Sequence, residues 1–187
     1  SIITKSDYKF KLLLLGVTCV GKTAILDYYL KGYPPESTII TTGFDYSTKK
    51  LNIEGKNITA FIWDIMGWSI PGHWGIIKRK QFDSFIMIYD IKSYKSFESL
   101  KSWLPDIKEI TDNKIHKMLI GNKYDLEDER KVPKEEGISL ALENGMLFFE
   151  TSVNKGININ EFFAQIIQDL IKLKEEEKNK LKEEELE

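Results

Sequence analysis

Gly16-Val17-Thr18-Cys19-Val20-Gly21-Lys22-Thr23 is the stretch of sequence that decides the fold. It follows the mostly apolar run 10–15 and precedes a segment, 24–31, that can form a helix. Two glycines followed by a lysine and a threonine have the spacing of a phosphate-binding loop between a strand and a helix. We expect the glycines to leave room for polyphosphate and the helix N-terminus to attract it. Lys22 would reach the terminal phosphates of a nucleotide and the Thr23 hydroxyl could ligate Mg²⁺, with an ordinary glycine-containing turn as the alternative.

Composition is typical of a single-domain cytosolic protein. With 187 residues, 42% of them hydrophobic, the chain can bury a full core without disulfides or structural metal ions. Cys19 is the only cysteine, which excludes an intrachain disulfide and favours a reducing compartment. A formal charge of −2 argues against nucleic acid as a partner, and no apolar run is long enough to span a membrane.

Strand and helix patterns alternate along the chain. Glycines and a proline in 65–75 favour a mobile loop there, and Pro105 interrupts one helical pattern. One hairpin within repeated helix–strand alternation predicts a three-layer α/β fold with a mostly parallel sheet and ligands at the carboxyl ends of its strands. The predicted strands are 8–15, 45–53, 57–64, 85–89, 118–121 and 146–149, and the predicted helices are 23–31, 93–110, 133–143 and 157–174.

A second motif, Asn122-Lys123-Tyr124-Asp125, follows the buried strand 118–121. A carboxylate on such a loop can accept both the ring N–H and the exocyclic amine of guanine, a pairing that adenine cannot make. Asn122 would tie neighbouring loops together, and the stem of Lys123 can lie along the base. Alone the motif is weak and suits a surface turn, but downstream of a phosphate-binding loop it indicates a guanine nucleotide.

With both motifs in place, residues 8–172 resemble the Ras superfamily of small GTPases, and most closely its Rab branch. The run 41–46, Thr-Thr-Gly-Phe-Asp-Tyr, is similar to the Rab first switch, and 63–67, Trp-Asp-Ile-Met-Gly, to the family's Trp-Asp-Thr-Ala-Gly. The resemblance implies a P-loop GTPase fold with a six-stranded sheet, one antiparallel hairpin at its edge and about five helices. It also implies that Thr23, Thr41 and, through water, Asp64 hold Mg²⁺, and that Lys22, Thr41, Gly67 and Trp68 occupy the catalytic positions.

The base-binding loop is also similar to that of Rabs, with two departures. Glu150-Thr151-Ser152 matches the start of Glu-Thr-Ser-Ala-Lys, but Val153 and Asn154 follow. The aromatic residue that stacks on guanine is displaced, because its family position is Pro34 and Tyr33 comes one residue earlier; this predicts faster nucleotide exchange. The nucleotide contacts implied by the resemblance are Thr18, Cys19, Val20, Gly21, Lys22, Thr23, Ala24, Tyr33, Pro34, Thr41, Gly67, Asn122, Lys123, Asp125, Ser152, Val153 and Asn154.

The largest departure from the family follows Gly67. There the family has the glutamine that orients the attacking water, and this chain has Trp68. An indole has one N–H donor and no acceptor, so it cannot hold that water in the same way. We expect slow intrinsic hydrolysis, whether Trp68 covers the site or points to solvent. An activating protein could supply the missing group in trans.

The recognition surface should also differ from that of Rabs. Of three aromatic residues that effectors read in Rabs, Tyr46 and Trp63 remain, but the third position is Lys78. We expect effector, exchange and activating proteins to contact 33–50 and 64–80, partners of the common Rab surface to bind poorly, and the chain to be a monomer.

The C-terminal segment differs in composition from the rest. The G domain is expected to span 1–172, followed by a charged tail, 173–187, that is helical or disordered. A solvated continuation of the last helix and a coiled coil with a partner are alternatives for the tail. Rabs end in prenylated cysteines, and no cysteine follows Cys19. We therefore expect a cytoplasmic protein, at the cytosolic face of a membrane only if a lipidated tail lies beyond this sequence.

Three functions of different class remain open. A slow-cycling, Rab-like GTP/GDP switch in vesicle trafficking or signalling is favoured. A GTP-locked binding module with little turnover would share the same motifs, and the rate of hydrolysis separates the two. A P-loop kinase or ATPase would share only the first motif, and 122–125 argues against it.

Overall fold

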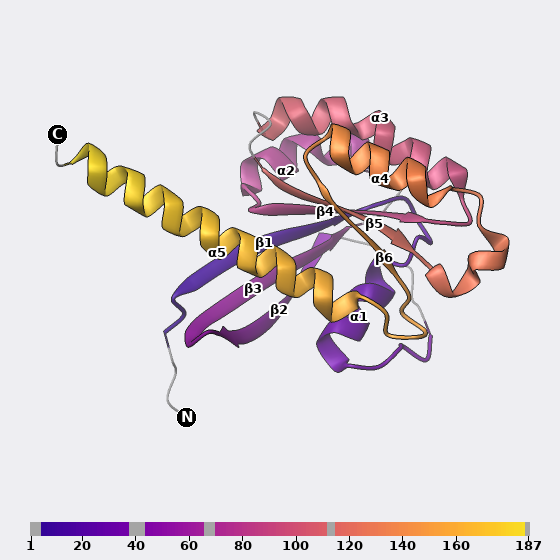
Figure 1. Ribbon diagram of the computed structural model, residues 1–187, viewed down its shortest axis with the longest axis horizontal. Helices are drawn as coiled ribbons and strands as arrows, with labels where there is room; N and C mark the ends of the chain where they lie inside the picture. Colours follow the sequence, from indigo (N-terminus) through magenta and orange to yellow (C-terminus); the bar gives the residue numbers. More distant parts are fainter. Residues whose placement is uncertain (1–4, 38–43, 66–69, 112–114, 186–187) are drawn as a thin grey trace.

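The computed structural model describes residues 5–37, 44–65, 70–111 and 115–185, and Figure 1 shows their arrangement. A six-stranded sheet has the order β2-β3-β1-β4-β5-β6 and is accompanied by five α-helices within the described residues. This confirms the expected α/β fold. The strands are β1 (Tyr8–Leu15), β2 (Phe44–Ile53), β3 (Lys56–Ile65), β4 (Ser84–Asp90), β5 (His116–Asn122) and β6 (Leu147–Thr151). The helices are α1 (Lys22–Lys31), α2 (Trp74–Lys80), α3 (Tyr94–Thr111), α4 (Lys134–Glu143) and α5 (Ile159–Glu184), with 3-10 turns η1 (Ile70–His73) and η2 (Tyr124–Glu129).

The centre of the sheet is β1, where the strand order reverses. It pairs in parallel with β3 on one side and with β4 on the other, and β5 and β6 continue the parallel part. Only β2 and β3 run antiparallel, as the predicted edge hairpin requires. In an open α/β sheet, ligands bind beyond the carboxyl ends of the strands at such a reversal. The loop after β1 lies at that point.

Two apolar cores cover the two faces of the sheet. One joins the sheet to α1 and α5, and includes Leu12, Ile25 and Phe163. The other joins it to α2, α3 and α4, and includes Leu13 and Phe97. Figure 1 shows α1 and α5 on one side of the sheet and α2, α3 and α4 on the other. Leu12 and Leu13 serve opposite cores because neighbouring residues of a strand point to opposite faces.

Helix α2 and turn η1 were not predicted. The expectation of a mobile loop over 65–75 is wrong for 70–75, where η1 and the start of α2 lie. Pro71, Gly72 and Gly75 favour a loop locally, but tertiary contacts outweigh that preference. The Trp74 ring packs edge-on against Trp103 of α3, its Nε1 donates to Asp106 Oδ2 at 3.0 Å, and Ile77 is buried.

Helix α3 is continuous through Pro105. Its apolar face, with Phe97, Leu100 and Ile107 fully buried on the sheet, provides the packing that offsets the local cost of proline. Helix α5 continues well into the charged tail, and its end projects beyond the sheet in Figure 1. None of the described helices is both long and apolar enough to cross a membrane. The helical continuation is compatible with both alternatives for the tail, because a coiled coil is also helical, and the domain boundary at 172 stays a prediction.

Candidate functional site

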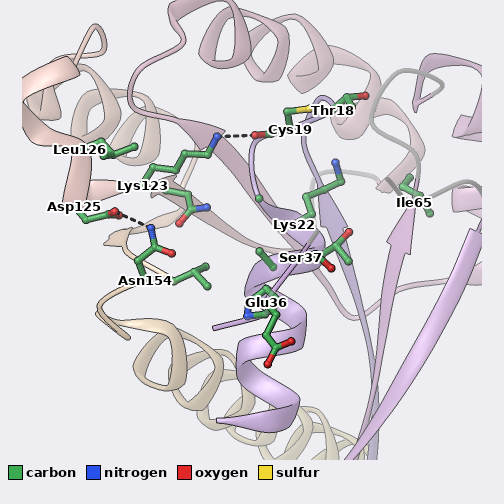
Figure 2. A pocket seen from close by; sticks show the side chains of 16 residues that line it. Thr18, Cys19, Lys22, Glu36, Ser37, Ile65, Lys123, Asp125, Leu126 and Asn154 are labelled. Atoms are coloured by element: carbon green, nitrogen blue, oxygen red, sulfur yellow. Dashed lines mark hydrogen bonds between the residues drawn. The ribbon is translucent and has the colours of Figure 1, made fainter. Parts of the chain in front are cut away.

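A cavity of about 500 Å³ opens at the carboxyl ends of β1 and β5, and Figure 2 shows it from close by. It brings together both motifs that the sequence singled out, although a hundred residues separate them. Its lining also includes segments that sequence reasoning did not select. The lining residues are Thr18, Cys19, Gly21, Lys22, Thr23, Ala24, Pro35, Glu36, Ser37, Ile65, Asn122, Lys123, Asp125, Leu126, Val153 and Asn154.

The two glycines of the first motif are needed by the protein's own packing. A Cβ added to Gly16 would lie 2.4 Å from the carbonyl oxygen of Ile88 in β4. One added to Gly21 would lie 2.4 Å from Asn122 Nδ2, and Gly21 has a φ of 102° that side chains rarely adopt. Sequence analysis gave room for polyphosphate as the reason for these glycines. The structure adds a second reason, the close approach of β4 and of the second motif.

Lys22 lies at the start of α1 and is almost fully buried, with 6% of its surface exposed. Its Nζ donates to the carbonyl oxygens of Gly16 at 2.8 Å and Val17 at 3.1 Å. An ammonium has three N–H donors, so one remains for an anion in the cavity. Burial lowers the pKa of Lys22, and the negative charge of Asp64 counters part of that effect. The loop therefore fixes the position of this cation.

Thr23 and Asp64 could form part of a metal site. Thr23 Oγ1 donates to Asp64 Oδ2 at 2.5 Å, and Asp64 is 6% exposed. A hydroxyl and a carboxylate are hard oxygen ligands, and Mg²⁺ is commonly bound by one or two such groups together with water and phosphate oxygens. The donor set thus fits Mg²⁺. No cluster of three or more His, Cys, Asp or Glu side chains suited to a metal occurs in the described ranges.

Asn122 joins the two motifs physically. It is 2% exposed, its Nδ2 donates to the carbonyl oxygen of Val20 at 2.9 Å, and Thr151 Oγ1 donates to its Oδ1 at 2.9 Å. Lys123 Nζ donates to the carbonyl oxygen of Cys19 at 2.8 Å. These hydrogen bonds hold together the loop after β1, the loop after β5 and the end of β6. They agree with the prediction that Asn122 joins neighbouring loops.

Asp125 faces the cavity with two side-chain donors on its carboxylate. Ser152 Oγ donates to Oδ1 at 2.7 Å, and Asn154 Nδ2 donates to Oδ2 at 3.0 Å. Burial raises the pKa of Asp125, but these two hydrogen bonds outweigh it and lower the pKa below its ordinary value. Asp125 is therefore ionised at neutral pH and acts only as an acceptor.

An ion pair between Arg130, next to η2, and Glu150, near the end of β6, was missed by sequence analysis. Arg130 Nη1 donates to Glu150 Oε1 at 2.6 Å, and Nε of the same guanidinium donates to Glu127 Oε1 at 2.8 Å. The Glu150 side chain is 6% exposed, and its Oε2 has no hydrogen-bond partner within the described ranges. Arg130 thereby connects η2, which carries Asp125, to the end of β6.

Several residues singled out from the sequence cannot be placed. Thr41, Gly67 and Trp68 lie outside the described residues. Tyr33 is 58% exposed, and the chain after α1 reaches the cavity through Pro35 and its two successors. Stacking of Tyr33 or Pro34 on a base stays a prediction.

The expected recognition surface contains a cation over an aromatic ring. The rings of Tyr46 and Trp63 lie 4.7 Å apart between centroids, and Tyr46 is 49% exposed. Lys80 Nζ lies 4.1 Å from the centroid of the Trp63 ring. The residue over the Trp63 ring is therefore Lys80, while Lys78, which the resemblance places at the third aromatic position, comes two residues earlier.

Known proteins match most of the chain. The Ras family model matches residues 11–172. The Ras-related protein Rab-13 of Canis lupus familiaris is 36% identical over 165 residues, which cover 88% of this chain and 81% of that protein. The human Ras-related protein Rab-8B is 34% identical over 165 residues, covering 88% and 80%. The Ras-related protein Rab-8 of Diplobatis ommata is 35% identical over 174 residues, covering 88% and 79%. The chain belongs to the Ras family of small GTPases and is Rab-like within it.

Proposed function

We propose that this protein binds GTP and GDP with Mg²⁺ and acts as a slow-cycling, Rab-like switch in vesicle trafficking or signalling. The observation that carries the proposal is the shared cavity of Lys22 and Asp125. A fixed cation lies at one end of it, and an ionised carboxylate that can pair with guanine lies at the other. The family membership supports the same reading.

The described residues have separate roles in this proposal. Lys22 and the N-terminus of α1 would stabilise the negative charge of the phosphates. Thr23 and Asp64 would hold Mg²⁺, which, when bound, supplies further neutralisation of phosphate charge. Asp125 would select guanine, and the Val153 amide would meet the guanine carbonyl. Thr41, as a further metal ligand, and Gly67, as a γ-phosphate contact, complete the proposed set.

The nucleotide itself gives the direct test. We expect protein purified gently, without added nucleotide, to release GDP or GTP when denatured, as identified by mass. In competition with a fluorescent guanine nucleotide, GTP should displace the probe far better than ATP. Release of an adenine nucleotide, or equal competition by the two, would contradict guanine specificity and favour another P-loop NTPase or kinase.

Hydrolysis is expected to be limited at position 68. Unassisted family members hydrolyse GTP at roughly 10⁻⁴ per second, and we expect this chain to be slower because Trp68 cannot orient the attacking water. In single-turnover assays Trp68→Gln should be roughly a hundredfold faster than wild type, the lower end of the range for a positioned catalytic group. Trp68→Leu is the matched control, since it removes the indole without restoring the amide, and it should show no such gain.

Two outcomes of that assay would change the interpretation. Equal rates for wild type and Trp68→Gln would show that position 68 does not limit hydrolysis. A wild-type protein that keeps GTP intact, even with candidate activating proteins, would favour the GTP-locked binding module.

We also propose that regulators and effectors contact 33–50 and 64–80. Lys78 stands at the third aromatic position of the resemblance, and Lys80 lies over the Trp63 ring, so positive charge replaces an aromatic side chain on this surface. Effectors that read the common Rab surface should therefore bind weakly in calorimetry, and tight binding would contradict this part of the proposal.

A further inference from the structure

Asn154 contacts the carboxylate that the proposed function assigns to the guanine base. Its Nδ2 lies 3.0 Å from Asp125 Oδ2, and Figure 2 shows the two side chains pointing toward each other at the wall of the cavity. Asp125 belongs to η2 and Asn154 to the loop after β6, so the contact forms only in the folded chain. Both residues line the cavity.

The two donors to Asp125 differ in how firmly they are held. Ser152 is fully buried, and its hydroxyl oxygen also accepts the backbone N–H of Lys155 at 3.1 Å. Its backbone is fixed by reciprocal hydrogen bonds with Ile157, at 3.2 and 2.9 Å. Asn154, in contrast, is exposed. A rotation of its side chain would open no part of the core, so Ser152 is a permanent partner of Asp125 and Asn154 is a displaceable one.

The chemistry of guanine makes a displaceable donor important. The base presents two neighbouring N–H groups, which a carboxylate meets with one oxygen each. A carboxylate oxygen has two lone-pair sites, and the Asn154 amide takes one of those on Oδ2 from within the cavity lining, the side on which the base would pair.

We propose that Asn154 competes with the guanine base for Asp125 and thereby shortens the lifetime of the bound nucleotide. The inference rests on the proposed function, because it requires that Asp125 pairs with guanine. It makes Asn154 a positioning residue that acts through Asp125, and it gives a definite sign: removing the amide strengthens nucleotide binding.

The rate of release of a fluorescent GDP analogue tests that sign. Asn154→Ala should release the nucleotide roughly fivefold more slowly than wild type, the effect of one hydrogen bond of ordinary net strength. Asn144→Ala is the matched control, since Asn144 Nδ2 also donates one hydrogen bond, to the Leu140 carbonyl oxygen at 2.9 Å, but lies at the end of α4. It should leave release unchanged. Unchanged or faster release from Asn154→Ala would overturn the proposal.

A double-mutant cycle shows whether the effect passes through Asp125. In the Asp125→Ala background, the equilibrium affinity for GDP should be the same with Asn154 and with alanine at 154, because the shared acceptor is absent. A gain that persists in that background would overturn the proposal and assign the effect to the loop. Failure of the wild-type protein to bind GDP at all would instead refute the proposed function, so the two failures are distinguishable.

Discussion

Replacing Asp125 by alanine is expected to weaken GTP binding by roughly a hundredfold or more, because two charge-assisted hydrogen bonds to the base are lost. ATP binding should stay weak and unchanged, since adenine offers the carboxylate no such pair of donors. The measurement is displacement of a fluorescent guanine nucleotide by GTP and by ATP, with wild type and variant side by side. Selectivity for GTP over ATP should fall with the affinity.

Asp128→Ala is the matched control for this variant. Asp128 lies three residues later in the same 3-10 turn, is exposed, and carries the same charge. Its replacement should change neither affinity nor selectivity. If Asp125→Ala weakened GTP and ATP equally, Asp125 would act on the shape of the cavity; if it weakened neither, the assignment of base recognition to this residue would be wrong.

The strands were the most predictable part of the fold. The run 85–89 is apolar throughout because β4 is buried on both faces. Side chains at 46–53, in the edge strand β2, alternate between exposed and half-buried. Helix α2 could not be predicted, since Gly72 and Gly75 favour a loop and the stabilising contacts come from α3, far along the chain. Local sequence carries no information on such a partner.

In the candidate site, too, local motifs were predictable and contacts between distant segments were not. Lys22, Thr23, Asn122 and Asp125 could be chosen from motif spacing, because that spacing encodes local geometry between a strand and a loop. The donors to Asp125 could not, since the pairing of Asp125 with Asn154 depends on how η2 and the loop after β6 meet. The steric requirement for glycine at 16 and 21 likewise could not be predicted, because it depends on where Ile88 and Asn122 lie in the folded chain.

Arg130→Met is expected to lower the free energy of unfolding by about 3 kcal/mol, because it leaves the buried Glu150 carboxylate without its cation. Methionine keeps much of the apolar stem of arginine, so the fall in the free energy of unfolding reflects the removed charge more than lost packing. Urea titration followed by circular dichroism measures the change. Nucleotide release should also quicken, since Arg130 connects η2 to the strand that precedes Ser152.

Two companion variants identify the buried pair as the cause. Glu127→Gln breaks only the exposed half of the network, because the Glu127 side chain is 54% exposed, and should cost little stability. Adding Glu150→Gln to Arg130→Met removes the uncompensated charge, so the double variant should be more stable than Arg130→Met alone. If the double variant were as unstable as the single one, lost packing and hydrogen bonds of the guanidinium, including the one to the Val132 carbonyl oxygen at 3.0 Å, would account for the effect. Recovery in the double variant would place the lost stability in the uncompensated charge of Glu150.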